Sequence, residues 1–299
     1  SDHPGVMPVA ALNLGMLLKD QGDPEGAEAA YQRAVDSGDV DVVPMAALYR
    51  GSLLKDQGDL VGAETAFQRA VDSGHPDVAP MAANNLGVLL TEEADVGGAR
   101  AAYELAVRSE HADVAPMAAN NLGVLLTEEA EVDDARAAYQ VAVDSGHADV
   151  APMAALNLGL LLDAQGDVAG ARSAYELAVD SGHADVVSVA AVNLGTLLRD
   201  QGDVAGARAA FHLAIDSGFV DIAPVSAGHL RVLLAGQGGS VNARPAARIG
   251  ADRVRQTAAL GARTGETGAD IDVEGVEGTD DLGTIEAMEE GDRGPNGRR

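Results

Sequence analysis

Apolar residues recur along most of the chain with the spacing of a helix, in paired segments separated by short polar turns. In the segment 149–165, DVAPMAALNLGLLLDAQ, they cover a broad face, and Asp149 is expected to cap the helix. In the next segment, 166–182, GDVAGARSAYELAVDSG, they form a narrower stripe between a cap at Asp167 and a closing Gly182. The pattern predicts two antiparallel helices, here called the first and second helix of a unit.

This unit repeats every 36 residues, and the stretch APMAANNLGVLLTEEA occurs identically at 79–94 and 115–130. A glycine of the first helix recurs at the same period, as Gly15, Gly51, Gly87, Gly123, Gly159 and Gly195. An aromatic residue of the second helix recurs likewise, as Tyr31, Phe67, Tyr103, Tyr139, Tyr175 and Phe211. Because one hairpin cannot bury its apolar face alone, the units are expected to stack. We predict an all-α fold, a right-handed superhelical solenoid of antiparallel helix hairpins with six full repeats and a degenerate seventh.

The recurring glycine and aromatic residue predict how the two helices pack. Gly159 and Ala171 leave little side chain where the helices cross, so the backbones are expected to approach closely. Tyr175 is expected to fill the gap left toward a neighbouring unit. The structural repeat positions are therefore the glycine and the aromatic residue of every unit.

The repetition weakens after the sixth unit. In the seventh, Pro245 falls inside the would-be second helix, which we expect to be lost. The segment 264–292 holds eleven acidic and no basic residues and is expected to be disordered. We predict a solenoid over 1–239, a repeat remnant with a short helix over 240–263, and an acidic disordered tail over 264–299.

The consensus A-x-x-N-L-G-x-L-L, then G-D, then A-x-x-A-[YF]-x-x-A, resembles the tetratricopeptide repeat (TPR). Six signature positions of that family are matched in the fifth unit by Leu158, Gly159, Leu162, Ala171, Tyr175 and Ala178. The period departs from the family's usual 34 residues, and Ala155 stands where the family has a large aromatic residue. The related Sel1-like repeats are the second family that the sequence resembles. The resemblance implies a concave groove that binds a peptide or a helical segment of a protein.

Composition narrows the possible partners. The formal net charge of −27 argues against nucleic acid and favours a basic protein partner. There is no cysteine and no apolar run long enough to cross a membrane, so we expect a cytoplasmic protein without membrane contact. Arginine outnumbers lysine eighteen to two, which is typical of a GC-rich bacterial genome.

One position of the first helix carries asparagine in five repeats, despite its cost within a helix. This asparagine ladder consists of Asn13, Asn85, Asn121, Asn157 and Asn193, with Asn84 and Asn120 beside it. The resemblance places the ladder on the concave surface, where its amides would bond a peptide backbone. The alternative is that each asparagine bonds a neighbouring helix and holds the repeats together. The first interpretation is favoured, whereas core packing is favoured for the neighbouring row Met45, Met81, Met117 and Met153.

No catalytic, metal or cofactor site is predicted. The histidines of the recurring DSGH turns lie one repeat apart, too far to share a metal ion, and are expected to serve at loops and helix ends. Neighbours in one turn cannot aim three side chains at one atom, so DSGH is not a triad. We therefore predict a noncatalytic protein-interaction scaffold. The alternatives are a regulatory or sensor region of a larger enzyme or signalling protein whose effector domain lies elsewhere, and a self-assembling structural solenoid.

Overall fold

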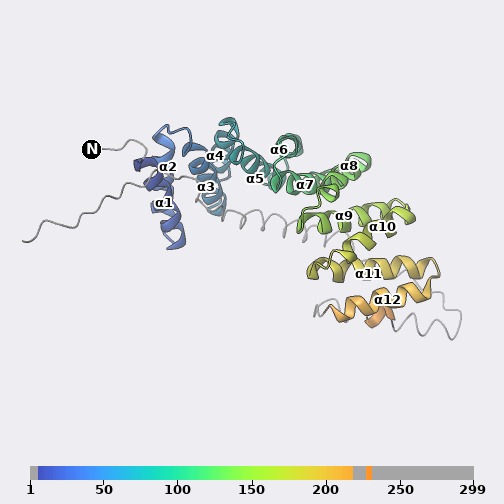
Figure 1. The fold of residues 1–299 in the computed structure, drawn as a ribbon. Helices are drawn as coiled ribbons and strands as arrows, with labels where there is room; N and C mark the ends of the chain where they lie inside the picture. The colour runs from blue at the N-terminus through green and yellow to red at the C-terminus, as the bar shows by residue number, and fades with distance from the viewer. Residues whose placement is uncertain (1–5, 218–226, 231–299) are drawn as a thin grey trace, which may run out of the picture.

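The computed structural model of the 299-residue chain describes residues 6–217 and 227–230. Within 6–217, twelve α-helices follow one another as six antiparallel pairs without a strand (Figure 1). Their bounds are α1 (Val6–Asp20), α2 (Pro24–Asp36), α3 (Val43–Asp56), α4 (Leu60–Asp72), α5 (Val78–Glu92), α6 (Val96–Arg108), α7 (Val114–Glu128), α8 (Val132–Asp144), α9 (Val150–Ala164), α10 (Val168–Asp180), α11 (Ala184–Asp200) and α12 (Val204–Asp216). The predicted all-α fold of stacked hairpins is confirmed.

The hairpins stack in chain order. Each odd-numbered helix pairs with the even-numbered helix that follows it, and that helix packs on the odd-numbered helix of the next repeat. From α3 to α11, consecutive odd-numbered helices also contact one another, whereas consecutive even-numbered helices make no comparable contact in the part that the structure describes. The array therefore curves with the odd-numbered helices on its inner side (Figure 1).

The recurring glycine makes room for the recurring aromatic ring of its own hairpin. A Cβ atom placed on Gly123 would lie 2.5 Å from Cδ1 of Tyr139, and the same distance separates a Cβ on Gly159 from Cδ1 of Tyr175. The Tyr175 ring thus fills the space that Gly159 leaves within its own hairpin, and its contact with a neighbouring unit stays a prediction. The ring lies over the glycine because no side chain there holds it away.

The rings also approach the next repeat at both ends of the array. The ring centroids of Tyr31 and Tyr49 lie 6.0 Å apart, and those of Phe211 and His229 lie 5.3 Å apart. Tyr49 and His229 occupy the position that carries asparagine in the other repeats. Each aromatic residue is therefore bounded by its own glycine on one side and by the following first helix on the other.

Helix caps follow the sequence in the second helices but not in the first. The Asp167 side chain accepts a hydrogen bond from the Gly170 amide at 3.0 Å, as predicted. Asp149 forms no such bond, because its backbone is already helical and its side chain cannot turn back under the first turn. Nδ1 of His147 accepts from the amides of Asp149 and Val150 instead, at 3.3 Å each. The histidine is the actual capping group.

The predicted boundaries beyond the sixth repeat are largely outside the described residues. Of residues 218–239, the last part of the predicted solenoid, only 227–230 are described, and they are helical. The segments 240–263 and 264–299 lie wholly outside the described ranges. The corresponding domain boundaries stay predictions.

Candidate protein-interaction surface

The inner surface is built from the odd-numbered helices, which carry the predicted binding positions. Met45, Met81 and Met117 are partly buried against the main core, and Met153 belongs to that core. This agrees with the core packing expected for this row. Val88, Val124 and Leu160 are also partly buried and follow the asparagine position on α5, α7 and α9.

The asparagine ladder changes from exposed to buried along the array. Asn13 is exposed and Asn85 is half-buried, whereas Asn121, Asn157 and Asn193 are buried. Asn84 and Asn120, which precede the ladder position on α5 and α7, are buried as well. Only the early members of the ladder thus offer their amides to a partner in this conformation.

Two buried asparagine pairs connect consecutive first helices. Nδ2 of Asn121 donates to Oδ1 of Asn84 at 3.1 Å. Nδ2 of Asn157 donates to Oδ1 of Asn120 at 3.0 Å. Bonds of this kind typically contribute about 1 kcal/mol each to stability. The geometry of these four residues fits the structural interpretation of the ladder, and their contact with a peptide stays a prediction.

The pairing stops between α9 and α11. Leu156 stands on α9 where Asn84 and Asn120 stand on α5 and α7, so Asn193 has no asparagine to which it can donate. Nδ2 of Asn193 and Oδ1 of Asn157 are buried without a hydrogen-bond partner within the described residues. The junction between α9 and α11 therefore lacks the asparagine hydrogen bond that joins α5 to α7 and α7 to α9.

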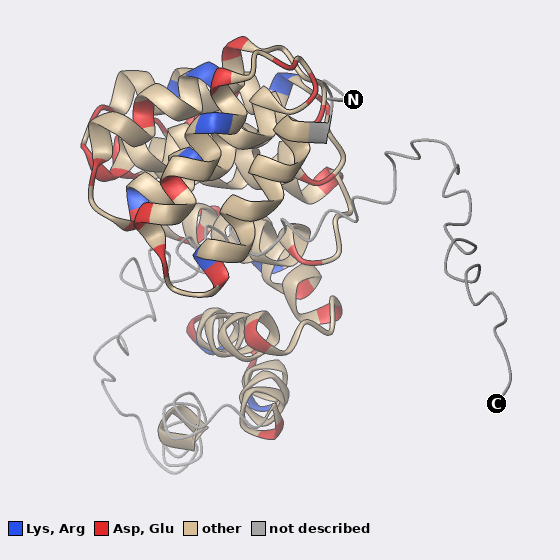
Figure 2. Cartoon of the chain, turned by 90° about the vertical axis from the view of Figure 1, so that its left-hand side faces the viewer, with Lys and Arg blue, Asp and Glu red and all other residues tan. Residues whose placement is uncertain are grey.

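Positive side chains at the edge of the inner surface already have acidic neighbours. Nζ of Lys19 lies 3.6 Å from Asp56, Nζ of Lys55 lies 3.1 Å from Glu92, and Arg199 lies 2.7 Å from Asp200. Figure 2 shows acidic residues at many helix ends and turns of the described chain, with few Lys and Arg among them. The described positive side chains at this edge are therefore paired within the chain.

The aromatic positions are interior supports and not part of the surface. Burial raises the pKa of Tyr103 to about 12, against a hydrogen bond with Thr91 that lowers it. Burial is also the largest cause that raises the pKa of Tyr31 to about 12. Both phenols stay neutral at physiological pH and hold their hairpins together.

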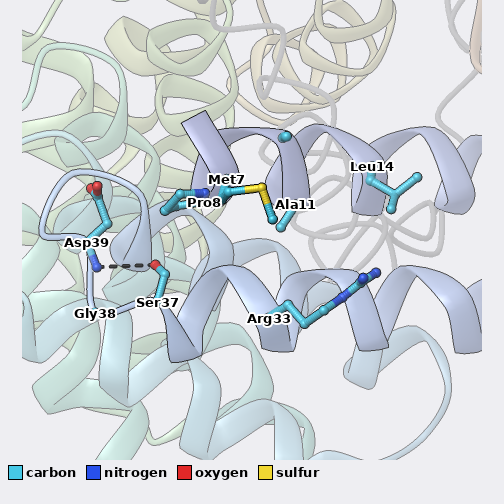
Figure 3. Close-up of a pocket in the computed structure, with 9 residues that line it drawn as sticks. Met7, Pro8, Ala11, Leu14, Arg33, Ser37, Gly38 and Asp39 are labelled. Carbon is cyan, nitrogen blue, oxygen red and sulfur yellow. Dashed lines mark hydrogen bonds between the residues drawn. The ribbon is translucent and has the colours of Figure 1, made fainter. Parts of the chain in front are cut away.

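The stacking face of α1 is open, because no hairpin precedes it among the described residues. Leu17 is 52% exposed there, whereas Leu53, its equivalent on α3, is 3% exposed. A hollow of about 680 Å³ lies between α1 and the end of α2, where Met7, Leu14 and Arg33 border it (Figure 3). Of its lining, Leu14 occupies a position that is buried in later repeats, as Leu86 and Leu122 show.

A second repeated surface lies on the even-numbered helices, and sequence reasoning missed it. One position of the second helix carries a large apolar residue that is 40 to 49% exposed in repeats three to six: Leu105, Val141, Leu177 and Leu213. We call these four residues the apolar ridge. The first two repeats carry Arg33 and Arg69 at this position. The 36-residue period could have revealed the row, but helical spacing alone does not show which apolar positions stay uncovered.

Sequence profiles of the tetratricopeptide repeat match residues 12–78, 56–115, 84–148 and 130–186, and a further profile of the same repeat matches 188–212. The chain belongs to the tetratricopeptide repeat family. A search of curated protein sequences finds no match.

Solved structures show the same tetratricopeptide fold. The array is similar to pilF of Pseudomonas aeruginosa, with a TM-score of 0.56 and 17% identity over 76% of this chain and 100% of that one. It is also similar to the C-terminal part of a TPR repeat-containing protein from Cytophaga hutchinsonii, with a TM-score of 0.56 and 15% identity over 70% and 83% of the two chains. At these identities the likeness concerns the fold alone.

The tetratricopeptide fold generally serves as a protein-interaction scaffold without catalysis. In the described ranges, no three His, Asp or Glu side chains gather in a way that could hold a metal ion. None of the described helices is both long enough and apolar enough to cross a membrane.

Proposed function

We propose that this tetratricopeptide array binds an extended or helical segment of a basic protein partner on its inner surface. The observation that carries the proposal is the curvature of the array, which brings α3, α5, α7, α9 and α11 together in one continuous face. A partner segment on this face would meet several repeats at once, as a strand or a helix in a groove does.

The chemistry of the face supports this assignment. Partly exposed Met81, Asn85 and Val88 follow one another along α5, so a partner would meet an adaptable thioether, an amide and an aliphatic side chain. Glu92 is exposed at the end of the same helix. The amide suits a peptide backbone, and the carboxylate suits Lys or Arg on the partner.

The proposal is tested by placing a photo-activated cross-linker at Val88 or Val124 and mapping the partner residues to which it couples in the native cell. A matched cross-linker at Thr65, which is exposed on α4 and lies outside the inner face, serves as the control. We expect a basic segment coupled to Val88 and Val124. Coupling only to Thr65 would contradict the inner surface as the binding face.

A second measurement separates binding from stability. Changing Asn85 to Ala should weaken binding by about 0.5–1.5 kcal/mol for one lost hydrogen bond, and the melting temperature should stay the same or rise because Ala is the better helix former. Full affinity in this variant would remove Asn85 from the site.

A further inference from the structure

The apolar ridge crosses the outer side of repeats three to six. Its four side chains come from α6, α8, α10 and α12, one from each helix at the same repeat position. Four equally spaced, half-exposed apolar side chains form a regular surface instead of scattered exposure.

Hollows lie between the even-numbered helices along this ridge. Between α6 and α8, a hollow of about 490 Å³ is bordered by Val141, Asp144 and Glu110. Between α8 and α10, a hollow of about 290 Å³ is bordered by Leu177 and Ser173, and Leu158 and Leu162 of α9 line it as well.

Acidic residues flank the ridge at positions that are unfavourable for the fold. Asp144, Asp180 and Asp216 are exposed and end α8, α10 and α12. A carboxylate there faces the negative end of the helix dipole, which is electrostatically unfavourable. The ridge is therefore an apolar row beside a row of negative charge.

Glu110 adds a carboxylate at a strained position. Its φ of 55° lies in the left-handed region, where the equivalent residues Gly38, Gly74, Gly146 and Gly182 also lie. A residue with a side chain is strained in this conformation because its Cβ atom crowds the following carbonyl oxygen. At this position Glu110 adds an acidic group to the edge of the hollow that Val141 and Asp144 border.

These features specify the chemistry of an occupant. Two copies of the ridge would bring their aspartates together, which disfavours pairing with itself. A purely apolar partner would bury carboxylates without a counter-charge. The ridge thus fits a segment that carries both aliphatic and basic side chains.

The chain itself contains such a segment at 246–263. Within a protein of net charge −27, this stretch has four arginines, Arg248, Arg253, Arg255 and Arg263, and the single acid Asp252. Its large aliphatic residues are Ile249, Val254 and Leu260. Its charge and side chains complement the ridge.

The connection is long enough. Fifteen residues, 231–245, join the last described residue to this segment. Extended, they span up to about 50 Å. Consecutive even-numbered helices both pack on the odd-numbered helix between them, so they lie at most about 20 Å apart, twice the spacing of packed helices. The segment can therefore reach past α12 to α10 and α8.

We propose that residues 246–263 dock on the apolar ridge of their own chain, with arginines at Glu110, Asp144 and Asp180 and an aliphatic side chain in the hollow beside Leu177. The ridge is then a second interaction surface, separate from the inner face. Docking there leaves the inner face accessible.

The absence of cysteine allows a direct test with the full chain. A nitroxide attached to Ser173→Cys should attenuate the amide NMR signals of 246–263, because Ser173 is exposed and borders the hollow. The matched control is Thr65→Cys, the equivalent exposed position in the second repeat, where Arg69 replaces the apolar residue. We expect strong attenuation from the first label and little from the second.

Charge variants and mixing complete the test. The double change Arg253→Glu and Arg255→Glu, or high salt, should abolish the attenuation, and Arg253→Lys with Arg255→Lys should preserve it. Equal attenuation from both labels, or none from Ser173→Cys, would overturn the proposal. So would attenuation that appears only when labelled and isotope-enriched chains are mixed, because a second copy would then supply the segment.

Discussion

The junctions between α5, α7 and α9 differ from the junction between α9 and α11. In the first two, a buried asparagine of one repeat donates to a buried asparagine of the repeat before it. At the third, Asn157 Oδ1 and Asn193 Nδ2 have no partner within the described residues. A single change, Leu156 in the place of asparagine, accounts for the missing bond.

The start of the sixth repeat differs as well. His111 and His147 cap their first helices through Nδ1, whereas Nδ1 of His183 is buried without a partner in the described structure. Ser188 replaces the proline of the earlier repeats, and α11 begins at Ala184, earlier in its repeat than α9 does. Repeats that share one apolar pattern can therefore be joined tightly or loosely by a few polar residues.

The largest expected loss of stability comes from removing the buried aromatic ring of a repeat, at two equivalent positions. Tyr139→Ala in α8 should lower the free energy of unfolding by about 3–5 kcal/mol, because it removes a buried ring from above Gly123. Phe211→Ala in α12 opens a similar cavity beyond the loose junction. Hydrogen exchange should show α11 and α12 opening separately from the rest of the array in Phe211→Ala. A single cooperative unfolding of both variants would show that the junctions do not differ in stability.

An intermediate effect is expected from two equivalent asparagine changes. Asn121→Leu leaves Oδ1 of Asn84 buried without a donor and should cost about 1–3 kcal/mol. Asn193→Leu removes a buried donor that has no partner, so its stability should stay the same or increase. Urea unfolding followed by circular dichroism measures both, and an equal loss in the two variants would show that the junctions do not differ.

The smallest effect concerns the helix caps. His147→Ala removes the acceptor for two amides of α9 and should cost about 0.5–2 kcal/mol, as the loss of other caps does. His183→Ala should cost less, because its Nδ1 accepts no hydrogen bond. Thermal melting curves of the two variants measure this difference. A larger loss of stability in His183→Ala than in His147→Ala would contradict the capping role of His147.

The sequence was sufficient to predict the hairpins because their signals are local. Apolar spacing and the glycine opposite an aromatic residue repeat every 36 positions, and so do the aspartate caps of the second helices except at Glu131. The sequence predicted a helix-end role for the histidine, but it assigned the cap to Asp149, which is the more common capping residue and follows the histidine by only two positions. Its role depends on a backbone conformation that residue identity does not show.

The burial of each asparagine could not be predicted from the sequence of a single repeat. Asn85 and Asn157 occupy the same position, yet one is half-buried and the other is buried. The difference therefore comes from the surrounding repeats and not from the position within one unit. For the same reason, the apolar ridge emerges only when the curvature of the whole array is known.

The identical stretches at 79–94 and 115–130 have a consequence for how this chain can change in length. Loss of residues 85–120 would join Asn84 directly to Asn121 and restore the sequence APMAANNLGVLLTEEA at the seam. The fused helix would keep α4 before it and α8 after it, each meeting side chains that it already meets. A gene with such duplicated stretches can gain or lose a repeat by misaligned recombination without creating a new packing interface. The binding face can thus become longer or shorter by one hairpin at a time. The contacts that stabilise each hairpin stay the same.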